Sequence, residues 1–249
     1  MKILFPFVGD SVGGSHISTL ELYSSLIDEN ITTLIVLHED NSPLSQYLRN
    51  KNIPFSILKS SKLAGETSGK LSIIIGIMTN FFHFSKFIKR HKIDIVHGND
   101  LRINLSWSLP AKFVAKGFVW HQRTLLSNSK LWLLIRYLCD YFVAISDVVM
   151  QSAPRNIQDG QKKMVYNPFN INSSINKELE RKYTIEKYSF PQDCFLIGCV
   201  GRIVDYKNLN FVIKNIFDIR HKLNKNVYLI VVGTGSEEYV NELKKYAYN

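Results

Sequence analysis

The sequence predicts an α/β fold built on parallel sheets, and three observations support this prediction. Short runs rich in Val, Ile and Leu alternate along the chain with stretches of helical periodicity. Several runs end in glycine or polar residues, which is typical of the ends of strands. The spacing between runs leaves room for crossover helices, which parallel strands need. With 249 residues, the chain can form one large or two modest domains.

The first part of the chain contains the predicted strands of one sheet. Each is a short apolar run bounded by polar or turn residues: 2–8, 32–38, 55–58, 93–100, 117–123, 141–146 and 162–166. Helical patterns lie between them. Pro110 is expected to kink or divide the helix at 101–115, because proline lacks a backbone donor. Residues 130–141 have the pattern of an amphipathic helix, and Ser146 can cap the next one.

A second part begins with the run at 195–200. This predicted strand ends at Gly201, Arg202 and Lys207 follow, and helical periodicity resumes at 209–217. In open α/β sheets, ligands lie at the carboxyl ends of strands. An Arg fork and a Lys charge beside a helix N-terminus can bind a diphosphate. The alternative is a surface loop with two solvated cations, and the spacing alone does not decide between them.

Two glycine turns provide places where a ligand could approach the backbone. Gly13 and Gly14 precede a predicted helix, whose positive end favours anions. Gly233 and Gly235 follow the predicted strand at 227–232 and precede a helix at 237–246. The alternative for the first turn is a tight connection without a ligand. Its spacing is not the three-glycine dinucleotide fingerprint.

The amino-acid composition limits which partners and which cellular compartment are plausible for this chain. The net charge of +10 favours anionic partners, such as nucleic acid, acidic lipid or phosphorylated substrates. We expect no nucleic acid, because no basic-aromatic module is evident. Three cysteines in apolar runs indicate a reducing compartment, and they have no metal-ligand spacing. No signal peptide is evident, and no apolar stretch reaches the roughly 20 residues of a membrane span.

Residues 59–92 are basic and amphipathic, with seven Lys and Arg residues against one acid, Glu66. Such a segment can lie on an anionic membrane surface. The alternative is a crossover helix that packs on the sheet, with cations favoured at its C-terminus. The two interpretations are compatible if only the preceding loop meets lipid.

The sequence around Arg202 also resembles a known family. The run Val-Gly-Arg-Ile-x-x-x-Lys-Asn at 200–208, followed by Leu-Ile-Val-Val-Gly-Thr-Gly-Ser at 229–236, is similar to the start of the donor-binding domain of family 4 retaining glycosyltransferases. The resemblance implies a GT-B fold of two Rossmann-like domains. It places an acceptor-side domain at 1–175, a linker at 176–190 and the first part of a nucleotide-sugar donor domain at 191–249.

The same resemblance implies roles for individual residues. Arg202 and Lys207 would hold the donor diphosphate, and His121 would lie against the donor sugar as the catalytic residue. The alternative for His121 is a satisfied structural histidine, and Arg123 could pair with an anionic acceptor or with a nearby carboxylate. The further candidates are, for the donor, Gly13, Gly14, Gly233 and Gly235, and, for the acceptor, His16, Asn99 and Arg123.

The resemblance also implies partners. The donor would be a UDP- or GDP-linked sugar and the acceptor a saccharide or a lipid-linked molecule, in cell-envelope polysaccharide or lipopolysaccharide synthesis. No metal or other cofactor is expected, since two cations can neutralise the diphosphate. The expected location is cytoplasmic, with peripheral attachment to the inner face of the plasma membrane through residues 59–92.

The sequence departs from the family in one respect. The family's acidic motif, two glutamates eight positions apart, has no counterpart in residues 191–249. We therefore expect a C-terminally truncated chain with doubtful activity. The alternatives are a non-catalytic homologue that binds an acceptor, a membrane or a partner subunit, and a nucleotide-sugar epimerase of the same fold.

Overall fold

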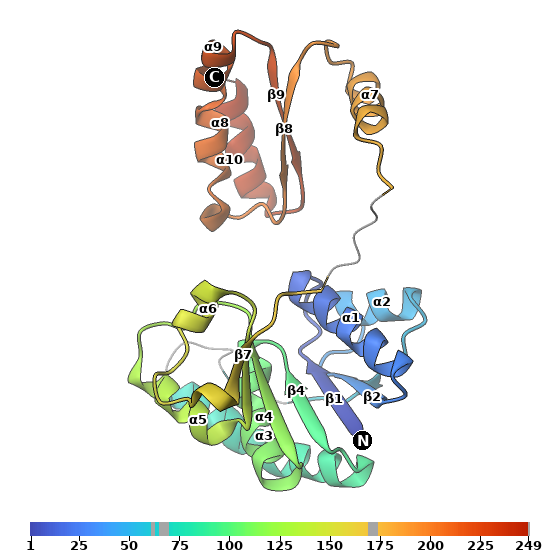
Figure 1. Cartoon of the computed structure of the whole chain (residues 1–249), viewed down its shortest axis with the longest axis vertical. Helices are drawn as coiled ribbons and strands as arrows, with labels where there is room; N and C mark the ends of the chain where they lie inside the picture. The colour runs from blue at the N-terminus through green and yellow to red at the C-terminus, as the bar shows by residue number, and fades with distance from the viewer. Residues whose placement is uncertain (61–62, 65–69, 169–173, 249) are drawn as a thin grey trace. The chain divides into compact units, whose positions relative to one another are not determined.

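The computed structural model describes residues 1–60, 63–64, 70–168 and 174–248. The chain divides into two compact units, Met1–Asn170 and Ile171–Asn249 (Figure 1), and each is described by itself. Most of the stretch expected as a linker, 176–190, forms helix α7 (Lys177–Tyr188). Asn176 caps this helix, because its side chain accepts hydrogen bonds from the backbone N–H groups of Glu178 and Leu179.

The first unit is built on one seven-stranded parallel sheet, as the sequence predicts. Its strand order is β3-β2-β1-β4-β5-β6-β7. The strands are β1 (Lys2–Phe7), β2 (Thr32–Leu37), β3 (Ser56–Ile57), β4 (Ile95–Gly98), β5 (Gly117–Gln122), β6 (Tyr141–Ala144) and β7 (Lys162–Met164). The connections run outward in one direction from β1 and in the other from β4. This order places a topological switch point, where α/β sheets bind ligands, between β1 and β4.

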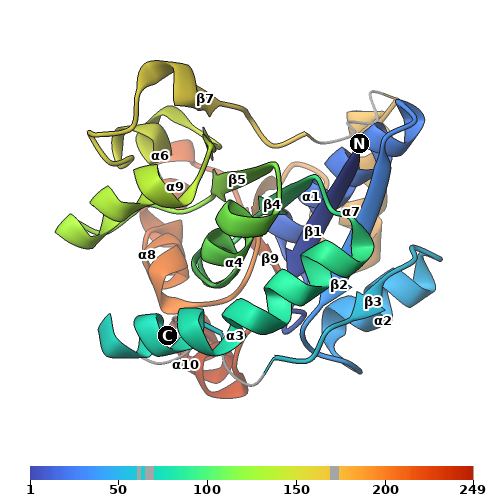
Figure 2. The ribbon, with the colours of Figure 1, turned by 90° about the horizontal axis from the view of Figure 1, so that it is seen from below.

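Helices cover both faces of this sheet. They are α1 (Gly14–Asp28), α2 (Pro43–Asn50), α3 (Lys70–His91), α4 (Leu101–Val114), α5 (Ile135–Leu138) and α6 (Asp147–Gln151), with 3-10 turns η1 (Lys130–Leu134) and η2 (Asp159–Gln161). Alternate residues of β1 point to opposite faces. Phe5 and Phe7 pack with α1 and α2, whereas Leu4 packs in the core that α3 and α4 share. Figure 2 shows α3 and α4 side by side.

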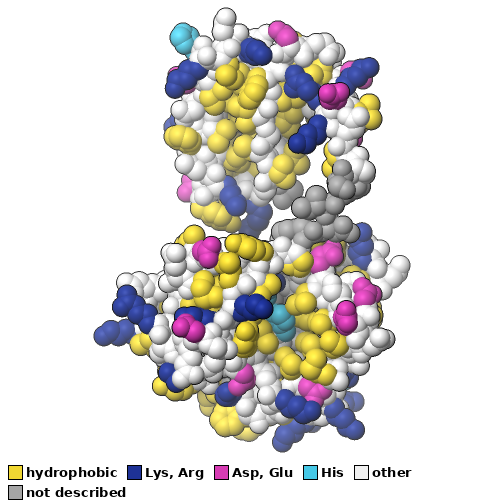
Figure 3. Space-filling model, in the orientation of Figure 1, with side chains coloured by type: hydrophobic (Ala, Val, Ile, Leu, Met, Phe, Trp, Pro, Cys, Tyr) yellow, Lys and Arg dark blue, Asp and Glu magenta, His cyan; other side chains and the backbone are white. Residues whose placement is uncertain are grey.

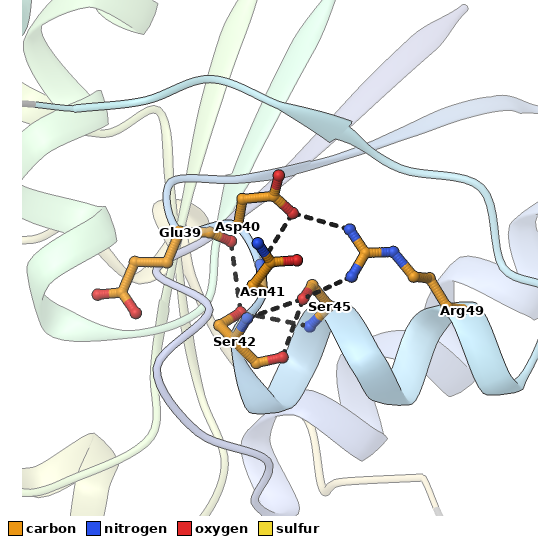
Figure 4. A network of polar contacts seen from close by, with 6 residues as sticks. All are labelled: Glu39, Asp40, Asn41, Ser42, Ser45 and Arg49. Atoms are coloured by element: carbon orange, nitrogen blue, oxygen red, sulfur yellow. Dashed lines mark hydrogen bonds and ion pairs between the residues drawn. The ribbon is translucent and has the colours of Figure 1, made fainter.

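A polar network fixes the start of α2, at the carboxyl end of β2 (Figure 4). The hydroxyl of Ser42 accepts from the backbone N–H of Ser45 at 3.4 Å, and the Ser42 N–H donates to the Ser45 hydroxyl at 2.9 Å. Arg49, one turn further on, forms an ion pair with Asp40 at 2.8 Å. The reciprocal serines satisfy backbone donors that the first turn of a helix leaves unpaired.

The second unit contains a two-stranded parallel sheet, β8 (Phe195–Val200) and β9 (Val227–Val232). Its other elements are η3 (Asp205–Lys207), α8 (Leu209–Lys214), α9 (Ile216–Leu223) and α10 (Glu237–Tyr248). The strand–loop–helix order predicted around Arg202 is therefore present. The helix expected at 209–217 is interrupted at Asn215, which caps the end of α8 and precedes α9.

Two local predictions differ from the structure. Pro110 does not divide α4, which continues through it to Val114. Pro110 is buried, and the free energy gained by its burial outweighs the loss of one backbone hydrogen bond. Residues 130–141 form a 3-10 turn and one short α-helical turn instead of a continuous amphipathic helix. The cap of α1 is Gly13, in the turn that the sequence places before this helix. The prediction that Ser146 caps the following helix is confirmed, since its hydroxyl accepts from the N–H of Val149.

Candidate functional site

A pocket of about 250 Å³ opens at the switch point of the first unit. Its lining residues follow the carboxyl ends of β1, β4, β5, β6 and β7: Gly14, Ser15, Asn99, Asp100, Leu101, Gln122, Arg123, Thr124, Ile145 and Asn167. The sheet topology alone brings these positions together, because parallel strands end at the same edge. Predicted site residues Gly14, Asn99 and Arg123 line this pocket, and His121 does not.

The turn after β1 presents free backbone donors to the pocket. The carbonyl of Gly13 accepts hydrogen bonds from the N–H groups of His16 and Ile17. The backbone N–H groups of Gly14 and Ser15 have no acceptor within the described part of the chain. A Cβ atom on Gly14 would meet nothing within 4 Å. This open space leaves the positive end of α1 accessible to an anion.

His16 stabilises the same turn from inside. Its Nδ1 atom accepts a hydrogen bond from the N–H of Gly13 at 3.2 Å, so the ring is neutral with its proton on Nε2. Burial lowers the pKa of His16, and the nearby Asp100 and Asp10 raise it by smaller amounts. The ring packs against Phe7, with 5.6 Å between centroids. His16 therefore acts on the turn geometry, and a role toward an acceptor stays a prediction.

Arg123 is a half-buried cation with neutral partners. Its terminal nitrogens donate to the hydroxyls of Ser18 at 2.6 Å and Thr19 at 2.7 Å, and to the Asn167 side-chain oxygen at 2.6 Å. No ion pair to a carboxylate is formed within the described residues. Burial lowers the pKa of Arg123 from 12.5 to about 10. The pocket thus contains a half-buried positive charge that forms no ion pair with a described carboxylate, although Asp100 lines the same pocket.

His121 lies in β5 and is buried beside a second histidine. Its Nδ1 atom is 3.1 Å from Nε2 of His97 and 3.5 Å from a terminal nitrogen of Arg123. Burial, then Arg123 and then His97 lower the pKa of His121 to about 2, and burial lowers that of His97 to about 3. Because a guanidinium can only donate, we assign Nδ1 of His121 as an acceptor and Nε2 as protonated. This Nε2 atom is buried without a partner.

Asn99 is fully buried at the end of β4. Its side-chain NH₂ donates to the carbonyl of Pro6 at 2.9 Å, which ties β4 to β1 beside the pocket. Its side-chain oxygen has no hydrogen-bond partner. The next residue, Asp100, caps α4, because its carboxylate accepts from the N–H groups of Arg102 and Ile103. Asp100 is therefore engaged with a helix end, whereas the side-chain oxygen of Asn99 is buried without a partner among the described residues.

In the second unit, Arg202 and Lys207 lie at one pocket. This pocket, of about 200 Å³, lies at the carboxyl end of β8 and is also lined by Cys199, Val200, Gly201, Leu209, Val212 and Val231. Both cations are exposed, and neither forms an ion pair with a described residue. The ammonium of Lys207 lies 5.9 Å from the centroid of the Tyr206 ring. The sequence prediction that these two cations share a site is in keeping with this geometry.

The structure gives Gly233 and Gly235 a packing role that the sequence analysis did not foresee. A Cβ atom on Gly233 would lie 1.7 Å from the carbonyl oxygen of Gly201, and one on Gly235 would lie 2.2 Å from that of Ile203. The space expected for a ligand is therefore filled by the neighbouring loop. The loops are joined by hydrogen bonds from Gly201 to Val232 and from Ile203 to Thr234. These glycines let the loop of Arg202 pack against the turn after β9, and a contact with donor stays a prediction.

Several residues of the first site have no signal in the sequence. Ser18, Thr19 and Asn167 hold Arg123, yet the first two lie more than 100 positions away from it. His97 was read as part of a strand, and only the pairing of β4 with β5 places it beside His121. Among the described residues, no group of three or more His, Cys, Asp or Glu could hold a metal ion. No described helix is long and apolar enough to cross a membrane.

Comparison with known proteins supports the fold, and one family model matches part of the chain. Residues 180–249 match the family model described as "Glycosyl transferases group 1". No curated protein matches the chain. The matched segment contains Arg202, Lys207 and both glycines of the turn after β9.

Solved structures resemble the chain over its whole length. HepE from Anabaena, crystallised with UDP and glucose, is 18% identical with a TM-score of 0.72, and the alignment covers 99% of this chain and 65% of HepE. A glycosyltransferase from Rickettsia africae is 20% identical with a TM-score of 0.74, covering 100% of this chain and 65% of that one. UDP-GlcNAc 2-epimerase from Methanocaldococcus jannaschii is 14% identical with a TM-score of 0.56, covering 98% and 68%.

These likenesses establish the fold. The chain has an α/β, GT-B-like architecture, with a Rossmann-like parallel sheet in its first unit and part of a second Rossmann-like domain in its second. It spans 65% of the length of HepE and of the Rickettsia protein. Because both transferases and an epimerase share this architecture, the fold by itself does not select the reaction.

Proposed function

We propose that the chain is part of a retaining glycosyltransferase of family 4, which moves a sugar from a nucleotide diphosphate to a saccharide or lipid-linked acceptor. The observation that carries this proposal is the shared pocket of Arg202 and Lys207, within the segment that matches the glycosyltransferase model. Two cations without a protein counter-ion, next to a strand end, suit a diphosphate. In this proposal, residues 1–175 form the acceptor side, 176–190 the linker and 191–249 the donor side.

The cations would act on the leaving group. As the bond between sugar and diphosphate breaks, negative charge develops on the phosphate oxygens. Arg202 and Lys207 would stabilise this charge with donors already in place, which is the way oxyanion sites lower a barrier. Taken by itself, the turn of Gly14 and Ser15 in the first unit would offer backbone N–H donors to an anionic group of a ligand. Gly233 and Gly235 would contribute by holding the loop that carries Arg202.

His121 would act on the sugar as a neutral donor. Its pKa of about 2 keeps the ring uncharged at neutral pH, and we assign the unpartnered Nε2 atom as protonated. A neutral imidazole N–H can donate to a sugar hydroxyl without adding a charge. His97 and Arg123 would fix this tautomer through Nδ1. His16 would act by holding the Gly13 turn.

Arg123 and Asn99 would contribute to the acceptor side. Arg123 lines the pocket without an ion pair to a described carboxylate, although Asp100 lines the same pocket, and the unpaired oxygen of Asn99 would accept from a hydroxyl that reached it. An acceptor that carries both an anionic group and hydroxyls matches these two features. This chemistry accords with the proposed place in cell-envelope polysaccharide or lipopolysaccharide synthesis.

Nucleotide binding by the whole chain tests the proposal. We expect calorimetry to detect binding of UDP or GDP, and the Arg202→Ala and Lys207→Ala variants each to weaken it about 10- to 100-fold, as expected for charge-assisted hydrogen bonds. Lys222→Ala is the matched control, since it removes one exposed cation from α9 of the same unit. A chain that binds neither nucleotide, or variants that bind like the control, would contradict the proposal and favour a non-catalytic module.

Product analysis separates transfer from epimerisation. Incubating the chain with a UDP-sugar or a GDP-sugar should release the nucleoside diphosphate only when an acceptor is present. An epimerase would instead convert the sugar while it remains linked to the nucleotide. Detection of a converted nucleotide-sugar, without released diphosphate, would overturn the transferase assignment.

A further inference from the structure

Helix α3 has two apolar faces, and packing within the first unit explains only one of them. Phe84 and Ile88 are buried in the core, and Ile77 packs against it. This face accounts for the expected crossover helix on the sheet. A second apolar face points away from that core, and its residues are largely exposed.

The exposed face continues across two helices. On α3, Ile74, Met78 and Phe82 are spaced by four residues and therefore form one stripe. Phe82 packs on Phe81, with 5.3 Å between ring centroids, and Phe81 packs on Phe113 of α4 at 5.9 Å. The exposed fractions are 55% for Ile74, 47% for Ile75, 59% for Met78, 79% for Phe82 and 71% for Phe113. We call these five residues the α3–α4 apolar patch.

Cations continue the same stripe toward the end of α3. Lys86 follows Phe82 by four residues, Arg90 follows Lys86 by four, and Lys89 lies between them on the same side of the helix. All three are exposed, and none forms an ion pair with a described residue. Neither α3 nor α4 contains an Asp or Glu residue. Figure 3 shows Lys and Arg side chains gathered at the lower edge of the first unit.

We propose that the α3–α4 apolar patch and the cations of Lys86, Lys89 and Arg90 form a docking surface for an anionic phospholipid bilayer. Exposed aromatic and aliphatic side chains insert at the boundary of headgroups and acyl chains, while adjacent cations contact the headgroup phosphates. The surface lies on two packed helices, α3 and α4. The expected membrane segment at 59–92 falls partly outside the described residues, at 61–62 and 65–69, and the proposal uses none of these.

Two other occupants fit less well. A second copy of the chain, joined by a twofold axis, would place this acid-free surface against itself and bring like charges together. Nucleic acid would neutralise the cations but would leave the exposed Phe82, Met78 and Ile74 without an apolar partner. A bilayer satisfies both parts of the surface at once.

Vesicle flotation with the full chain tests this proposal without any measurement of sugar transfer. We expect the chain to float with vesicles of phosphatidylcholine mixed with phosphatidylglycerol, and not with pure phosphatidylcholine. The Lys86→Gln/Lys89→Gln variant should bind about 30-fold more weakly at low salt, roughly five-fold for each lysine. Its control is Lys51→Gln/Lys222→Gln, which removes the same charge from exposed positions elsewhere.

Serine substitutions test the apolar part of the surface, and one of them has a matched control. Met78→Ser/Phe82→Ser should reduce vesicle binding at least ten-fold, because the inserted side chains are lost. Ile75→Ser should weaken binding measurably, whereas Ile27→Ser should not; both residues are 47% exposed, but Ile27 lies on α1. Circular dichroism checks that each variant folds, as expected for exposed positions.

Three results would overturn the proposal. The first is absence of binding to anionic vesicles by the folded wild-type chain. The second is equal binding by the patch variants and their controls. The third is a dimer in solution that Met78→Ser/Phe82→Ser dissociates, which would make a second copy the occupant. None of these results bears on nucleotide binding, which tests the proposed function separately.

Discussion

Replacing Gly233 by alanine tests whether this glycine serves packing or ligand approach. Its new Cβ atom would lie 1.7 Å from the carbonyl oxygen of Gly201, where ordinary van der Waals contact begins at 3.4 Å. The turn after β9 and the loop after β8 would therefore have to separate by about 1.7 Å. Two hydrogen bonds join these segments, from Gly201 N–H to the Val232 carbonyl at 2.9 Å and from Ile203 N–H to the Thr234 carbonyl at 2.8 Å.

The size of the effect follows from these contacts. Each hydrogen bond contributes about 1 kcal/mol, and overpacking in a fixed backbone costs about 1–3 kcal/mol. We expect Gly233→Ala to lower the free energy of unfolding of the second unit by about 3–5 kcal/mol. Gly198→Ala is the control, because it adds a Cβ atom to the same sheet at a position where nothing lies within 4 Å. Its expected effect is below about 1 kcal/mol.

Denaturant titration of the full chain can follow the two units separately. All three tryptophans, Trp107, Trp120 and Trp132, lie in the first unit, so their fluorescence reports only that unit. Far-ultraviolet circular dichroism reports both. We expect Gly233→Ala to shift the dichroism transition of the second unit and to leave the fluorescence transition unchanged. If Gly233→Ala is as stable as Gly198→Ala but loses nucleotide binding, the packing role is refuted and ligand approach explains the glycine.

Three further predictions concern the first unit. Arg123→Met should lower its free energy of unfolding by about 2–4 kcal/mol, because three charge-assisted hydrogen bonds are lost and only part of the loss is offset by removing a buried charge; inorganic phosphate should raise the melting temperature of the wild type and not of this variant, and an equal rise in both would contradict the anion site. The pKa values of His97 and His121, about 3 and about 2, lie below the unfolded value of about 6.5. Only the unfolded state then takes up protons as the pH falls from 6.5 to 4.5, so each histidine should lower stability by about 1.4 kcal/mol per pH unit. Fluorescence-detected urea unfolding at several pH values gives the free energy of unfolding as a function of pH. In folded His121→Gln this dependence on pH should be shallower by the same amount, and an unchanged dependence would refute the low pKa of His121. Ser42→Ala should cost about 1 kcal/mol through loss of the α2 cap shown in Figure 4, and a change below about 0.3 kcal/mol would show that the cap is replaced by solvent.

The sequence alone supported the parallel α/β architecture because its signals are local. Buried parallel strands read as short apolar runs, and the seven runs of the first part correspond to β1–β7. Arg202 and Lys207 are five positions apart in one βα loop, so their closeness could be expected from the sequence, and both line the same pocket; their role toward a donor stays a prediction. Where local signals compete with packing, prediction failed: Pro110 lies inside a continuous helix, and the amphipathic pattern at 130–141 gives mostly a 3-10 turn.

The sequence could not show why Gly233 and Gly235 are glycines, for a different reason. A glycine followed by Thr-Gly-Ser is compatible with ligand approach and with close loop packing alike. The structure distinguishes them, because the carbonyls of Gly201 and Ile203 occupy the space beside Gly233 and Gly235. Gly14 shows the reverse case, since the space beside it is open.

The sequence by itself determined the fold class of this protein and the positions of the strands of its first sheet, and it placed two cations close together after β8, since each depends on residues close together in the chain. Only the tertiary structure decided the environment of Arg123, its neutral partners Ser18, Thr19 and Asn167, and the His97–His121 contact. Those contacts join residues from different strands and helices. Their distances and burial follow from strand order and register, which no local pattern specifies.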